Sequence, residues 1–261
     1  MGQVSHRKWL RGRARVKAKA ARCDDGAMPV CPIPGCGRPT QAKEGRGLSQ
    51  FHCRYHVQFK NRHGSFWKAT YRASELQPYR RAAERLVRVC HDDKEILAAV
   101  QRLAALLRWA GPVEHMSDVM TMAPKAKAKA ALARMRRAEV RPERLLSIYL
   151  TIRAALAEDP VGPGGEPGEY RRVQVAKAAH RLASGYHADY GNGARYDRYP
   201  RSSGLALRHL GRFIEAACEV VGEACLDAVL TLKVAAAGPR VPVPPPVFPR
   251  SRRVGQGVAR G

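Results

Sequence analysis

A short run of cysteine and histidine residues near the start of the chain constrains the fold more than any other feature. Cys31 and Cys36 are separated by four residues, and Cys53 and His56 follow as a C-x2-H pair. Three thiols and one imidazole at these spacings can surround Zn²⁺ tetrahedrally, because each short pair turns the backbone toward the ion. We therefore predict a structural zinc site at these four residues.

The segment between the two pairs is rich in turn-forming residues, namely Gly37, Pro39, Gly45 and Gly47. Such residues let the second pair fold back over the first. They also leave little apolar material around the cysteines, which disfavours the alternative that these are core residues or disulfide partners. The fourth ligand is the least constrained. His56 is preferred because of the C-x2-H spacing, and the nearby alternatives are His52, His63 and Cys23.

The chain carries a large excess of positive charge. It has 47 lysines and arginines against 22 aspartates and glutamates, which gives a formal net charge of +25 over 261 residues. Such an excess attracts polyanions, of which nucleic acid is the commonest in a cell. No segment has the uninterrupted apolar length of a membrane span. We expect a nucleic-acid partner, DNA rather than RNA, and no membrane partner.

Cysteine usage bears on the compartment. The chain has seven cysteines, an odd number, and no secretory signal, which together indicate a reducing environment. We therefore expect a cytoplasmic protein, associated with the nucleoid if it binds DNA.

Two segments in the first third of the chain are candidate nucleic-acid contacts. Residues 3–22 contain many cations and no acid, a composition typical of a disordered arm that phosphates can neutralise. Residues 59–72 alternate aromatic and basic side chains, which suits base stacking with phosphate contacts, or equally a small aromatic core with its cations outward. The candidate contacts in these segments are Arg7, Lys8, Arg11, Arg13, Arg15, Lys60, Arg62, Lys68 and Arg72.

Two later segments are also candidates. Residues 124–138 again carry cations without acids, and their mostly alanine apolar face predicts a weakly buried basic helix or a helix-prone linker. Residues 185–201 form a predicted loop dense in tyrosine and arginine. The candidate contacts here are Lys125, Lys127, Lys129, Tyr190, Arg195, Tyr196, Arg198 and Arg201.

Apolar residues at helical spacing predict a mainly α fold, with an N-terminal zinc-binding module, a multi-helix domain and basic disordered termini. Capping boxes at Ser74 and Asp92 predict two helices that pack as an antiparallel hairpin. Further helices are predicted from Arg141, from Glu169 to Ser184, and as one long helix from Leu205 to Leu232.

These elements suggest five parts. They are a basic arm (1–26), the zinc module (27–66), a helical hairpin with a basic helix (67–140), a helical domain with the Tyr/Arg-rich loop (141–236) and a Pro/Arg-rich tail (237–261). Proline-rich segments adopt extended conformations that can bind other proteins, so the tail is a candidate site for a protein partner.

Catalytic chemistry has weak support in the sequence. His180, His187 and Asp189 could gather a catalytic metal, as a nuclease requires, but no acidic pair stands at a convincing spacing. No phosphate-binding glycine loop is present. We therefore expect no catalytic residues, and we keep RNA binding or RNP assembly, and then a metal-dependent nuclease, as alternatives to DNA binding.

The stretch from residue 29 to 66 resembles small zinc modules of phage and mobile-element proteins that handle DNA, some of them attached to HNH endonucleases. The residues that carry the resemblance are Cys31, Pro34, Gly35, Cys36, Pro39, Gly47, Leu48, Cys53, His56, Arg62, His63 and Gly64. The resemblance implies a DNA-binding or protein-docking element built around a metal, and it implies no reaction.

Overall fold

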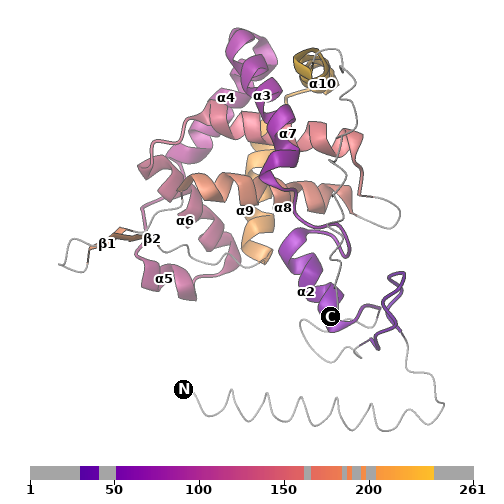
Figure 1. The fold of residues 1–261 in the computed structure, drawn as a ribbon. Helices are drawn as coiled ribbons and strands as arrows, with labels where there is room; N and C mark the ends of the chain where they lie inside the picture. Colours follow the sequence, from indigo (N-terminus) through magenta and orange to yellow (C-terminus); the bar gives the residue numbers. More distant parts are fainter. Residues whose placement is uncertain are drawn as a thin grey trace, which may run out of the picture.

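The computed structural model describes residues 30–40, 51–161, 166–183, 187–189, 195–197 and 204–237 (Figure 1). The arm (1–26), most of the tail and part of the Tyr/Arg-rich loop lie outside the described residues. The predicted contacts Arg7, Lys8, Arg11, Arg13, Arg15, Tyr190, Arg198 and Arg201 lie there too. None of the described helices combines the length and the apolar character needed to cross a membrane.

The described chain is mainly helical, as predicted. In order, the elements are α2 (Arg54–His63), α3 (Ala73–Val89), α4 (Lys94–Arg108), α5 (Met116–Thr121), α6 (Pro124–Arg137), α7 (Pro142–Glu158), α8 (Pro167–His180), the 3-10 turn η1 (Arg181–Ala183), β1 (His187–Asp189), β2 (Arg195–Asp197), α9 (Gly204–Cys218) and α10 (Glu223–Ala237). The two short strands pair antiparallel within the segment predicted as a loop.

Helix α7 lies at the centre of the helical body (Figure 1). Its side chains are buried without interruption from Leu145 to Ile152. A helix that is apolar on every side needs neighbours on every side, and α3, α4, α8, α9 and α10 all pack against it. The buried hydroxyl of Thr151 donates to the carbonyl of Ser147 (2.6 Å), so this polar group is satisfied within the helix.

One continuous apolar core runs from Ala82 on α3 to Val229 on α10. This core includes residues on both sides of the boundary predicted at residue 140, which stays a prediction. The predicted hairpin of the first two helices is wrong: α3 packs mainly against α7 and α10, and α4 against α9, α7 and α6. The reason is that α7, farther along the chain, offers each of them an apolar face.

Two of the later helices also differ from expectation. Helix α6 is not weakly buried, because its small alanine side chains let it pack closely on α9, with Leu132 and Met135 in the core. The long helix predicted from 205 to 232 is divided into α9 and α10. Between them the backbone N–H of Gly222 donates to Oε2 of Glu95 (2.9 Å), which holds the turn that returns α10 to α3.

Helix α2 joins the helical body through close backbone contacts at two glycines. Gly64 ends α2 at φ 83°, and a Cβ built on it would lie 2.9 Å from Cα of Tyr170 and 3.0 Å from Cβ of Val173. A Cβ on Gly204, the first residue of α9, would lie 2.2 Å from the carbonyl oxygen of Asn61 on α2. Only glycine permits this approach, so α2 has a defined position against α8 and α9.

Replacing Gly64 with alanine tests this contact, and Gly111 provides a matched control. Gly111 has φ +89° with no atom within 4 Å of the added Cβ, so Gly111→Ala should cost only about 1–2 kcal/mol for the left-handed backbone. Gly64→Ala should add about 1–3 kcal/mol of overpacking. Chemical denaturation of both variants measures the difference. Equal losses of stability in the two variants would show that the backbone around Gly64 shifts to accommodate a Cβ at little cost.

Candidate metal centre

A tight turn presents the first pair of cysteines. Val30 and Pro39 form an antiparallel bridge, and the N–H of Cys31 donates to the carbonyl of Arg38 (2.8 Å). The chain inside this bridge passes through two glycines with positive φ, which is why the turn can be so short. Cys36 lies within the turn, and its sulfur is within 4.8 Å of that of Cys31.

The second pair lies at the start of α2. Cys53 is the N-cap residue, and His56 is in the first turn of the helix. Burial raises the pKa of the Cys53 thiol, but the backbone N–H groups of His56 and Tyr55 and the neighbouring thiols outweigh this, so the pKa is lowered. The helix start therefore favours a thiolate at Cys53, which is the form that binds metal.

The four side chains come together as the spacing predicts. Their ligand atoms all lie within 4.8 Å of one another. Nδ1 of His56 is 3.3 Å from Sγ of Cys31 and 3.4 Å from Sγ of Cys53, and the sulfurs of Cys36 and Cys53 are 3.7 Å apart. The last distance is far longer than the bond of about 2.05 Å in a disulfide.

These distances match the edges of a metal tetrahedron. Zinc bonds of about 2.3 Å to sulfur and about 2.0 Å to nitrogen require about 3.8 Å between two sulfurs and about 3.6 Å between sulfur and nitrogen. Cys31 and Cys53 are 5% and 2% exposed, so the group is shielded from water on that side. The four residues could therefore hold a metal ion.

Of the three histidines considered as the fourth ligand, the structure places His56 in the cluster. Burial and the charge of Arg38 lower the pKa of His56, which favours the neutral imidazole that metals bind. His52 instead stacks on Phe66, with ring centroids 3.6 Å apart. Nδ1 of His63 lies 3.0 Å from the backbone nitrogen of Thr70, away from the cluster. Cys23 lies outside the described residues.

Across the described residues, this is the one group of three or more His, Cys, Asp or Glu side chains that could hold a metal. His180, a candidate for a catalytic metal, is largely buried, and burial and the charge of Arg134 lower its pKa to about 4. A positive neighbour opposes cation binding. His187 and Asp189 lie on β1, of which the structure describes only the backbone.

Two of the predicted nucleic-acid contacts, Lys60 and Lys68, form ion pairs with carboxylates within the protein. Nζ of Lys60 lies 2.7 Å from Glu166 and 3.6 Å from Glu169, and Nζ of Lys68 lies 2.7 Å from Asp159. Both lysine side chains are mostly buried. Their charges are balanced inside the protein, where they fasten the module to the ends of α7 and α8.

The aromatic side chains of residues 59–72 mostly face the same junction. Phe59 packs on His63 with ring centroids 4.3 Å apart, and the indole of Trp67 donates to the carbonyl of Val161 (3.0 Å). Tyr71 meets Tyr170 edge-on at 5.7 Å. This arrangement agrees with the small aromatic core that was one of the two alternatives for this segment. The stacking of bases on these rings stays a prediction.

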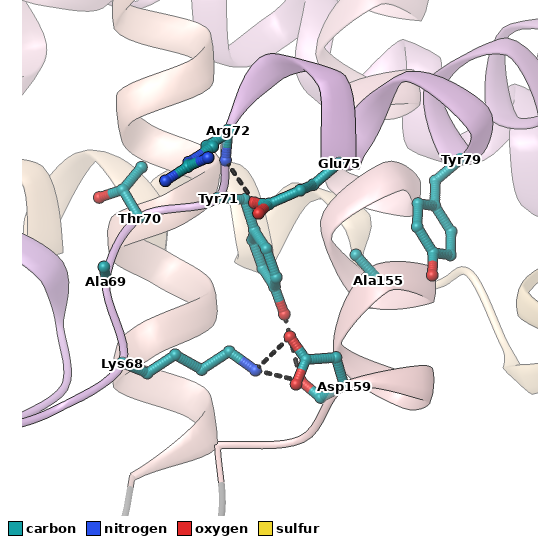
Figure 2. Close-up of a pocket in the computed structure, with 9 residues that line it drawn as sticks. All are labelled: Lys68, Ala69, Thr70, Tyr71, Arg72, Glu75, Tyr79, Ala155 and Asp159. Carbon is teal, nitrogen blue, oxygen red and sulfur yellow. Dashed lines mark hydrogen bonds and ion pairs between the residues drawn. The ribbon is translucent and has the colours of Figure 1, made fainter. Parts of the chain in front are cut away.

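A pocket of about 440 Å³ lies beside this junction (Figure 2). Figure 2 shows Lys68 and Tyr71 pointing toward Asp159, and the carboxylate of Glu75 close to the backbone of Arg72. These polar groups already have partners in the protein. The pocket therefore offers a ligand few unsatisfied groups, and we assign it no ligand.

The remaining predicted cations lie at the surface. Arg62, Arg72, Lys125 and Lys129 are exposed, while Nζ of Lys127 donates to the carbonyl of Met120 (2.9 Å). Arg195 and Tyr196 stand on β2.

Comparison with known proteins returned nothing for this chain: no family model, no curated protein and no solved structure matches it. The functional interpretation therefore depends on the chemistry of the residues themselves.

Cys36→Ser tests the metal centre, and Cys90→Ser is the matched control because Cys90 is a half-buried cysteine outside the cluster. Cys36→Ser should lower the metal content of the purified protein and unfold residues 30–63, since a structural metal site supplies much of the folding free energy of such a segment. Elemental analysis and proteolysis measure both effects. Full metal content in Cys36→Ser would exclude this cluster as the binding site.

His180 predicts a specific dependence of stability on pH. Its pKa is about 4 in the folded protein against 6.5 for the unfolded residue, so the unfolded state binds a proton more readily. The stabilisation is complete above pH 6.5 and is lost as the pH falls toward 4, on the order of 3 kcal/mol in total. His180→Gln should therefore lose less stability than the wild type between pH 7 and 5 in urea titrations. Identical slopes would contradict the buried neutral state.

Proposed function

We propose that the protein is a zinc-stabilised DNA-binding protein that contacts mainly the phosphate backbone. The zinc has a structural role and the polymer is held by positive charge. The excess of positive charge carries this proposal: the net charge is +25, and many of the carboxylates are already used inside the protein.

The donor set supports zinc over other metals. Three thiolates and one imidazole in a closed tetrahedral group suit Zn²⁺, whereas calcium and magnesium require oxygen ligands. All four positions come from the protein, so no position is left open for a water or a substrate. A site of this kind supports folding, with an apparent binding free energy of about 10–16 kcal/mol in small zinc peptides.

The ion pairs inside the protein support the proposal of a polyanionic partner. Glu84, Glu158, Glu166, Glu169, Glu215, Glu223 and Asp159 each pair with a lysine or arginine of another element. These carboxylates stabilise the fold and lie close to their own cations. The cations that remain, together with the arm, create the positive field that attracts a polyanion. Phosphate contacts of this type do not depend on base sequence.

The proposed cellular location and genetic origin rest on the positive charge, the Cys/His cluster and the resemblance of residues 29–66 to zinc modules of phage and mobile-element proteins. A protein of this kind fits a phage or another mobile element, and it acts in the cytoplasm, on the nucleoid. The Pro/Arg-rich tail offers a docking segment for a protein partner.

Deletion of residues 3–22 tests the proposal, because these residues supply many cations and no acid. Each phosphate contact adds about 0.9 to the slope of log affinity against log salt for duplex DNA. Loss of the arm should therefore reduce that slope, as measured by fluorescence anisotropy from 50 to 200 mM salt. An unchanged slope would show that the arm does not contact phosphates.

Competition between duplex DNA, single strands and RNA distinguishes the classes of partner. Duplex DNA should compete best for a labelled duplex. Preferential displacement by RNA would favour the RNA-binding alternative, and absence of binding to every polyanion, heparin included, would overturn the proposed function.

A further inference from the structure

We infer that the phosphate backbone binds at a specific surface, the junction strip, formed by Arg62 at the end of α2, Lys177 near the end of α8 and Arg181 in η1. Lys177 and Arg181 were not among the residues that the sequence indicated. The inference rests on the proposed function and specifies its binding site.

Hydrogen bonds fix Lys177 at the junction between α2 and α8. Its Nζ lies 2.6 Å from Oγ1 of Thr70, and that hydroxyl lies 2.9 Å from Nδ1 of His63. One turn earlier on α8, Nε2 of Gln174 donates to the carbonyl of His63 (2.8 Å). Lys177 is therefore held next to the last residues of α2, where Arg62 directly precedes His63.

The two charges that shift the pKa of Lys177 are both positive. Its pKa is lowered to about 8, first by burial and then by the positive charges of Arg181 and Arg62. The pKa of His63 is lowered to about 4 by burial and by Lys177 and Arg62. In the described part of the chain, no ion pair joins Lys177 or Arg62 to a carboxylate.

The contrast with Lys60 is informative. Lys60 stands two residues before Arg62 on the same helix, but it contacts the carboxylates of Glu166 and Glu169. The junction strip thus combines repulsion between fixed cations with the absence of a described carboxylate partner for two of them. A phosphate diester placed there would remove that repulsion, so its binding is favoured beyond the general attraction of the protein.

The start of α9 also borders this surface. A Cβ on Gly204 would lie 2.2 Å from the carbonyl oxygen of Asn61, the residue before Arg62.

A double variant tests the strip. Arg62→Gln with Arg181→Gln removes two exposed cations from it, and Arg85→Gln with Arg88→Gln removes two exposed cations from α3 as a control with the same net charge. Affinity for a labelled 20-bp duplex is measured from 50 to 200 mM salt for both full-length variants, with thermal unfolding to confirm that each is folded.

The strip variant should lower the salt slope by about 2, since each lost phosphate contact removes about 0.9, while the control should keep the slope of the wild type. Equal slopes in the two variants, with a wild type that binds DNA, would overturn the strip and leave the proposed function standing. A wild type that binds no polyanion would overturn the proposed function itself.

Discussion

The burial of α7 is the constraint on which the rest of the helical body depends. A helix buried without a break from Leu145 to Ile152 has no stable arrangement until other helices cover all of its sides. Five helices do so, and their order in the sequence matters less than the apolar face that each presents. Residues 30–40 lie outside this core, and their buried side chains are Thr40 and Cys31, one of the four clustered residues. The metal ion that this cluster could hold would stabilise such a short segment.

The sequence predicted the local features well and the distant ones poorly. The Cys/His cluster was predictable because a ligand pair is set by a few residues of turn. The helix that begins near residue 74 was predictable too, although its N-cap is Arg72, whose N–H donates to Glu75, and not Ser74. The pairing of helices was not, because sequence periodicity identifies a buried face without naming the partner that covers it.

The sequence also did not predict which individual cations have carboxylate partners in the folded protein. Lys60 and Arg62 belong to one basic stretch of sequence. Lys60 pairs with Glu166, which precedes α8, and with Glu169 on α8, whereas Arg62 lies near the positive charge of Lys177. Lys177 stood in a predicted helix of ordinary composition and gave no signal. Which cations are balanced depends on residues a hundred or more positions away, so it emerges only from the folded chain.

The length of α2 has a consequence for any polymer that touches both of its ends. Arg62 follows Cys53 of the Cys/His cluster by nine residues, which at about 1.5 Å per residue is about 14 Å. Successive phosphates on one DNA strand advance by about 3.4 Å, so this helix spans roughly four nucleotides. Because Gly64 packs closely at one end and the Cys/His cluster lies at the other, a single helix sets this spacing. Under the proposed function, a strand that contacted both ends would therefore always be held over the same short length.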